Sequence, residues 1–247
     1  MVSALLPLAA VGEVGKDFFH ERTSDTLPCQ ATDKLFCFDW ARENIDRYVT
    51  PTVQHLEIVV ISVVIGFVVA FALALLAHRR TWLRPPLLAG TGILYTIPSV
   101  AFFFLLEPIT GRGRETAIIA LSVYTLQIIY RNTMVGFANV PTSVKDAARG
   151  MGQTDRQILW RVELPLATPE IIAGLRIATV STVALATLAT FVSGGGLGEQ
   201  IFRGGNIDFT TSIIIAGGIA ILIALTFDVL LLTAQRLATP WRRAAAR

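Results

Sequence analysis

The side chains that most often carry out catalysis or bind metals are few in this 247-residue sequence. Cys29 and Cys37 lie eight residues apart near the N-terminus, with His20 nine residues before the first of them. This set fits no zinc-site spacing. The sequence has neither an H-E-x-x-H motif nor the G-x-x-x-x-G-K-[ST] loop that holds a nucleotide. We therefore expect no metal, cofactor or ATP site in this chain, and no membrane-embedded enzyme, which would need such a cluster or a nucleophile beside a base.

The two cysteines offer a different chemistry. In an oxidising compartment Cys29 and Cys37 can form a disulfide, and we predict one. The alternative is two unpaired thiols in a loose segment, because pairing depends on a geometry that the sequence alone does not supply.

Two charged residues, Arg176 and Asp228, stand within otherwise apolar stretches. An ionised side chain in such surroundings is costly unless it has a partner or reaches a polar interface. Both residues lie at a similar depth in their stretches, and we predict that they form an ion pair. The alternative is that each side chain extends separately to the membrane interface.

Such apolar stretches dominate the composition. Hydrophobic residues make up 53% of the chain and charged residues 16%, and the mean hydropathy is +0.60. These values are too apolar for a soluble domain, and a helix of about 20 apolar residues crosses a bilayer. We predict an all-α integral membrane protein with about five transmembrane helices, over residues 56–77, 86–106, 116–137, 171–192 and 211–233.

The second stretch is interrupted by Pro98, which lacks a backbone N–H and clashes with the preceding turn of a helix. We predict a kink or an unwound step there. Discontinuous membrane helices often flank transport sites, so Tyr95, Thr96, Pro98 and Ser99 are candidate pathway residues. The ring of Tyr95 would suit a quaternary ammonium ion. The alternative is that Pro98 only bends a helix.

Two other stretches carry interruptions. Arg131 lies late in the third stretch, where it is tolerable if its side chain extends to the interface. The fourth stretch contains a run of small residues that includes Ser181 and Thr182, which we add to the pathway candidates. The glycine-rich run 194–198 follows it, and either makes a close helix or gate contact or is a mobile outer loop.

The distribution of lysine and arginine predicts the orientation. These residues cluster after the first stretch, between the third and fourth, and after the fifth, and such clusters favour the cytoplasmic side. Acidic residues outnumber basic ones over 13–50. We therefore predict that the N-terminus lies outside and the C-terminus in the cytoplasm. The chain then divides into an extracytoplasmic segment 1–52, a membrane domain 53–240 with a cytoplasmic loop 139–168, and a cytoplasmic tail 241–247.

The cytoplasmic loop contains two predicted short helices. The first begins near 141–143, where Ser143 and Asp146 have the spacing of a capping box. It ends at 150–152, where two glycines interrupt the helical pattern.

The second loop helix is predicted over 155–162. Thr154 offers an N-cap with Gln157 three residues later, and Pro165 is the expected stop. Its apolar residues at 158, 159 and 162 share one face. A short exposed helix with such a face is suited to a groove on a partner protein.

The same loop resembles a family signature. Its residues Asp146-Ala147-Ala148, Gly152, Val162, Leu164 and Pro165 have the spacing of the Glu-Ala-Ala loop in permease subunits of binding-protein-dependent ABC importers. Asp146 stands where the family has glutamate, which keeps the carboxylate and shortens its reach. The segments 96–99, 131–133, 147–152 and 194–198 look like the osmoprotectant branch of that family, and the resemblance covers residues 52–235.

This resemblance implies the type I ABC importer permease fold, as a multi-pass protein of a bacterial inner membrane. It implies a second permease subunit, identical or paralogous, cytoplasmic ATPase subunits that bind ATP and Mg²⁺, and an extracytoplasmic solute-binding protein, which we expect on a separate chain. Membrane lipid surrounds such a subunit, and nucleic acid is not an expected partner. The loop would dock on the ATPase through the residues Asp146, Ala147, Ala148, Gly150, Gly152, Ile158, Leu164 and Pro165.

The resemblance also implies a solute class. Permeases of this branch import quaternary ammonium osmolytes such as glycine betaine, choline or carnitine, and selection resides largely in the external receptor. Another small solute, such as an amino acid, is an alternative. A non-transporting membrane scaffold is a second alternative, although it would not explain the spacing in the loop.

Overall fold

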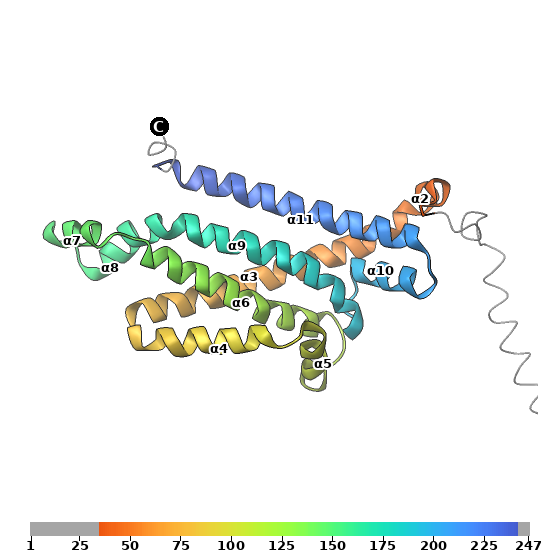
Figure 1. Cartoon of the computed structure of the whole chain (residues 1–247), viewed down its shortest axis with the longest axis horizontal. Helices are drawn as coiled ribbons and strands as arrows, with labels where there is room; N and C mark the ends of the chain where they lie inside the picture. The colour runs from red at the N-terminus through yellow and green to blue at the C-terminus, as the bar shows by residue number, and fades with distance from the viewer. Residues whose placement is uncertain (1–34, 242–247) are drawn as a thin grey trace, which may run out of the picture.

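The computed structural model describes residues 35–241, and helices make up almost all of that range. The long helices pack side by side along one axis, and short helices lie at both ends of the bundle (Figure 1). The helices are α2 (Phe38–Asn44), α3 (Val49–Arg79), α4 (Arg84–Thr96), α5 (Ser99–Thr110), α6 (Arg114–Ala138), α7 (Thr142–Gly150), α8 (Asp155–Ile158), α9 (Leu164–Ala186), α10 (Leu197–Asn206) and α11 (Thr210–Ala238). The prediction of an all-α fold is confirmed for the described residues.

Not all five predicted spans are equally apolar. Within the described residues, three helical segments are long and apolar enough to cross a membrane: Phe38–Arg79, Asp155–Val192 and Thr210–Ala238. A fourth span results if the bent pair Thr81–Thr96 and Ser99–Thr110 is one crossing. The third predicted span forms α6. Its 25 residues are long enough to cross a membrane, but their composition is less apolar than that of the three segments above.

The position of α6 explains its lower hydropathy. It lies in the middle of the bundle, where α3, α4 and α9 pack against it. Its buried residues include Ser122 and Thr125, whose hydroxyls donate to carbonyl oxygens of α6 itself. Close approach of its neighbours depends on glycine, since a Cβ on Gly66 of α3 would overlap Thr125 and one on Gly174 of α9 would overlap Asn132. A helix covered by protein in this way needs less apolar surface than one that faces lipid.

The predicted interruption at Pro98 separates α4 from α5. Ile97 and Pro98 have extended backbones, with ψ angles of 128° and 130°, because a proline disfavours the helical conformation in the residue before it. The two helices are bent by 98° at this break. As a result α5 turns across the end of the bundle, opposite the end that carries α7 and α8 (Figure 1).

One prediction about the loop is wrong. Pro165 does not stop the second loop helix, because α8 continues through the π-helical segment Leu159–Glu163 directly into α9. Pro165 lies in the first turn of α9, a position that tolerates proline because its missing N–H is not needed there. The wider π turn before it changes the hydrogen-bond register. The chain therefore forms one unbroken helical rod from Asp155 to Ala186.

Candidate functional site

The loop between α6 and α9 forms the end of the bundle at which α7 and α8 project (Figure 1). The residue before α7 is Pro141, which makes no side-chain cap hydrogen bond, so the expected cap from Ser143 is not formed. Asp146 instead accepts a hydrogen bond from Arg149, with 3.4 Å between Nη1 and Oδ1. The first loop helix thus begins where the sequence predicted, at Thr142, but no side chain caps its N-terminus.

The turn after α7 requires a glycine. The N–H of Gly152 donates to the carbonyl of Arg149 (2.9 Å), and the N–H of Gln153 donates to the carbonyl of Ala148 (3.1 Å). This pair of bonds is a Schellman motif, whose left-handed residue is most often glycine. Gly152 has φ +77°, whereas Gly150 is helical and has no neighbour that a Cβ would meet. The turn therefore depends on Gly152 and not on Gly150.

The second loop helix has the predicted cap. The N–H of Thr154 donates to Oε1 of Gln157 (2.8 Å), and the N–H of Gln157 donates to Oγ1 of Thr154 (3.4 Å). The capping box is therefore confirmed. Together with Gly152 it fixes the angle between α7 and α8.

The apolar face predicted for the second helix points inward. Ile158 and Leu159 are 3% and 4% exposed. Leu159 belongs to a buried cluster that includes Phe137 of α6 and against which Leu75 of α3 packs. Ile158 is consequently not available for a partner, and neither is Ala148 of α7, which is 2% exposed. The large apolar side chains that the loop 139–168 does expose are Val144, Met151, Trp160 and Leu166, with Met151 72% exposed.

A buried carboxylate that the sequence did not single out anchors the loop. Glu163 lies in the π segment and is 8% exposed at its side chain. Its Oε2 is 2.6 Å from Nε2 of His78, near the end of α3, and its Oε1 is 2.9 Å from Nζ of Lys145 in α7. The His78 ring also packs on Phe137 of α6. Three segments distant in the sequence therefore meet at one carboxylate, and its charge is compensated by the Lys145 ammonium.

The sequence offered little signal for this cluster. Glu163 occupies the variable position between the aliphatic residue and the leucine of the loop signature. His78 is 85 residues away from it in the chain.

Four of the pathway candidates lie together at the break between α4 and α5. Tyr95 is 45% exposed, and its ring lies edge-to-face with Tyr124 at a centroid distance of 5.9 Å. The Tyr124 hydroxyl donates to the carbonyl oxygen of Ile97, in the break itself. The Thr96 hydroxyl donates to Ile93 O at 2.7 Å, and Ser99 begins α5 after Pro98.

The other two pathway candidates lie on α9, away from this break in the sequence. Thr182 is 2% exposed, and its hydroxyl donates to Ala178 O at 2.7 Å. A residue buried within the bundle cannot line a pathway between two subunits, so the expectation for Thr182 is wrong. Ser181, next to it, is partly exposed.

The structure brings the two charges of the apolar stretches together. Arg176 of α9 donates from Nε to Oδ1 and from Nη2 to Oδ2 of Asp228 in α11, both at 2.9 Å. Nearby, Nε2 of Gln235 donates to Pro169 O at 2.7 Å. This bidentate pair, of the strong kind for guanidinium and carboxylate, joins α9 to α11.

The glycine-rich run makes a close contact at the opposite end. Gly195 and Gly196 have φ of +79° and +87°, and the Gly196 N–H donates to Oε1 of Gln54 at 3.1 Å. A Cβ on Gly198 would overlap the carbonyl of Thr187. Of the two alternatives for this run, the structure shows the close packing contact.

One predicted pair extends beyond the described residues. Cys37 is buried just before α2, and its N–H donates to Oγ1 of Thr211 at 2.9 Å. Cys29 lies outside the described residues, and so does His20. The disulfide stays a prediction.

The bundle is similar to solved ABC transporters. A chain of the methionine ABC transporter MetNI in an inward-facing conformation matches with a TM-score of 0.70 and 22% identity, over 78% of this chain and 96% of that chain. A chain of an amino acid ABC transporter with histidines matches with a TM-score of 0.70 and 18% identity, over 81% and 98%. At these identities the likeness shows the fold class alone, which the bundle shares with these ABC transporter chains.

Sequence relatives narrow that class. Residues 59–244 match the family described as binding-protein-dependent transport system inner membrane component, and the chain belongs to this family. A choline transport system permease protein of Bacillus subtilis is 36% identical over 190 residues, covering 76% of this chain and 87% of the relative. A carnitine transport permease protein of Listeria monocytogenes is 36% identical over 182 residues (74% and 83%). An osmoprotectant import permease protein of Salmonella typhimurium is 34% identical over 204 residues (80% and 94%).

The family membership confirms the resemblance drawn from the loop. The chain is a permease subunit of an ABC importer and an integral component of the inner membrane. The loop of α7 and α8 is the segment that carries the family signature.

Proposed function

We propose that this permease transports a quaternary ammonium osmolyte such as glycine betaine, choline or carnitine. The observation that carries the proposal is the set of relatives at 34–36% identity, whose names refer to choline, carnitine and osmoprotectant transport. The methionine and amino acid transporters share the fold at 22% identity or less. A likeness at that level supports no statement about the solute.

The transport pathway, in this proposal, is enclosed by this subunit and a second permease subunit, an identical copy or a paralogue. The break between α4 and α5 contributes to it. Tyr95 is held there by its contact with Tyr124 and keeps part of its ring exposed. An aromatic face attracts a quaternary ammonium ion, so Tyr95 would contact the passing solute.

Energy would come from a separate ATPase subunit, which binds ATP and Mg²⁺ and receives the α7–α8 loop. The exposed Met151 and Trp160 suit a partner groove, and a rigid turn at Gly152 presents them. Arg79 ends α3, Arg80 follows it and Arg84 begins α4. This connection lies at the same end of the bundle as the loop (Figure 1), which supports a cytoplasmic location for that end. A solute-binding protein would then deliver the solute at the opposite end.

Uptake measurements test the solute class. Labelled glycine betaine, choline, carnitine and methionine are supplied to cells with the complete transporter, to cells lacking only this subunit, and to the latter with the subunit restored. We expect uptake of at least one quaternary ammonium compound to require the subunit, and methionine uptake to be independent of it. Unchanged uptake of all three ammonium compounds would refute the assignment, and loss of methionine uptake alone would favour an amino acid.

A further inference from the structure

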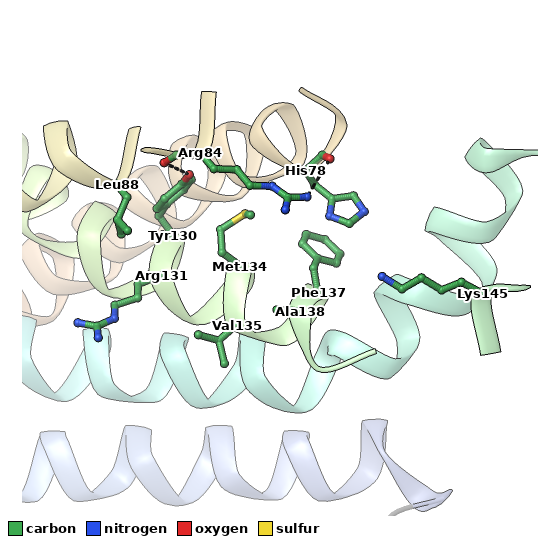
Figure 2. Close-up of a pocket in the computed structure, with 10 residues that line it drawn as sticks. All are labelled: His78, Arg84, Leu88, Tyr130, Arg131, Met134, Val135, Phe137, Ala138 and Lys145. Atoms are coloured by element: carbon green, nitrogen blue, oxygen red, sulfur yellow. Dashed lines mark hydrogen bonds between the residues drawn. The ribbon is translucent and has the colours of Figure 1, made fainter. Parts of the chain in front are cut away.

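A cavity of about 420 Å³ opens between α3, α4 and α6 at the end of the bundle that carries the loop (Figure 2). Neither the pathway nor the proposed docking surface accounts for it. Its wall is formed largely by apolar side chains, with Leu88 from α4 and Met134, Val135 and Phe137 from α6. Leu88 and Val135 are 45% and 44% exposed, so the apolar wall continues outward to the surface of the subunit.

Two arginines at the cavity have no carboxylate partner among the described residues. The Arg84 guanidinium donates to Ala77 O (3.2 Å) and His78 O (3.4 Å), which fixes it beside the cavity (Figure 2). Arg131 lines the other side and points away from Arg84. The remaining cationic side chain, Lys145, is already paired with Glu163. Arg84 is therefore an exposed cation that is held beside the cavity and has no carboxylate partner within residues 35–241.

The cavity lies at the level where three apolar stretches meet the charged segments. The first predicted span ends at residue 77 and the second begins at 86, so Arg84 lies between them. The third predicted span ends at Phe137, which also lines the cavity. In a membrane this boundary is the level of phospholipid headgroups. Basic pockets between membrane helices on the cytoplasmic side bind anionic headgroups.

We propose that this cavity is a binding site for an anionic phospholipid. The phosphate contacts Arg84, the glycerol region occupies the cavity, and the acyl chains leave along Leu88 and Val135. A planar guanidinium suits a phosphate well. An acidic side chain of the ATPase would satisfy Arg84 but would leave the apolar wall uncovered, whereas a phospholipid satisfies both. The proposal does not depend on which solute the permease transports.

The test uses the assembled transporter with its ATPase subunits, purified in mild detergent and depleted of lipid. Native mass spectrometry measures the retention of dioleoylphosphatidylglycerol, with dioleoylphosphatidylcholine as a neutral-headgroup lipid of the same chains. We expect preferential retention of the anionic lipid and a fall of about fivefold to tenfold in its affinity in Arg84→Gln. Arg80→Gln removes the same charge outside the cavity and should leave retention unchanged.

Further measurements distinguish a phospholipid from a free phosphate compound as the ligand. Glycerol 3-phosphate has the headgroup chemistry without acyl chains, and we expect it to compete poorly. Met134→Gln keeps both arginines and makes the apolar wall polar, so it should also weaken retention of the anionic lipid. This variant replaces Arg84→Gln in the test if the Arg84→Gln transporter does not assemble. The proposal is overturned by equal retention of the two lipids, by equal effects of Arg84→Gln and Arg80→Gln, or by effective displacement with glycerol 3-phosphate.

Discussion

Replacing Glu163 with glutamine should lower both solute-stimulated ATP hydrolysis and transport. The carboxylate makes two charge-assisted hydrogen bonds, at 2.6 Å to His78 and 2.9 Å to Lys145. Each such bond contributes about 1.5–3 kcal/mol, and loss of one partner of a buried pair costs about 3–5 kcal/mol. Glutamine keeps one acceptor oxygen, so we expect the attachment of the loop to weaken by about 2–4 kcal/mol. At 1.4 kcal/mol per factor of ten, the attached state becomes roughly thirtyfold to several-hundredfold less favoured.

The assay reconstitutes the complete transporter in liposomes and measures ATP hydrolysis and solute uptake, each with and without the loaded binding protein. Only an attached loop can pass ATPase movement to the spans, so we expect solute-stimulated hydrolysis and uptake in Glu163→Gln to fall by at least about tenfold. Glu170→Gln is the matched control, because it removes a carboxylate two turns further along the same rod that has no ion pair within residues 35–241. The exchange Glu163→Lys with Lys145→Glu should restore part of the coupling.

Wild-type coupling in Glu163→Gln, with the subunits assembled, would refute this reasoning. A fall of equal size in Glu170→Gln would also count against it, since the effect would then belong to any charge loss in this region. Loss of assembly in Glu163→Gln alone would show that the cluster is needed for folding, and the charge exchange would then decide whether the pairing itself matters.

Three further outcomes follow from the structure. Gly152→Val should lower solute-stimulated ATP hydrolysis, because a β-branched residue at φ +77° costs at least about 1–2 kcal/mol, whereas Gly150→Ala should have no effect on the same assay. Arg176→Met and Asp228→Leu should each lower the melting temperature of the purified transporter, and the double variant should recover most of that loss, since an apolar pair removes the uncompensated charge. Tyr95→Leu should raise the KM for uptake of the quaternary ammonium solute by about twofold to fivefold at saturating binding protein, which corresponds to about 0.5–1 kcal/mol of cation–π attraction. Tyr95→Phe keeps the ring and should leave the KM unchanged. Equal kinetics in the two variants would exclude a role for the ring.

Features set by neighbouring residues could be predicted from the sequence. The capping box of Thr154 and Gln157 needs only its own spacing, and the break at Pro98 follows from the covalent ring. The proximity of Arg176 and Asp228 could be predicted although they are 52 residues apart. Membrane depth limits the partners of an intramembrane charge to the few that share its level.

Features that depend on tertiary packing could not be predicted in the same way. The apolar face that contains Ile158 could belong to a partner or to the fold itself, and helical periodicity is the same in both cases. Pro165 was expected to end a helix, yet the first turn of α9 accommodates it. Glu163 was missed because its two partners come from α3 and α7, and no local spacing relates the three residues.

The arrangement of the rod suggests how movement of the loop would reach the pathway. Displacement of α8 passes directly into α9, because the helix has no break between Asp155 and Ala186. Glu163 ties the start of the rod to α3, and the Arg176–Asp228 pair ties its middle to α11. The two attachments therefore predict different phenotypes. Glu163→Gln should impair transmission into the spans while leaving the bundle stable, whereas Arg176→Met should destabilise the bundle itself.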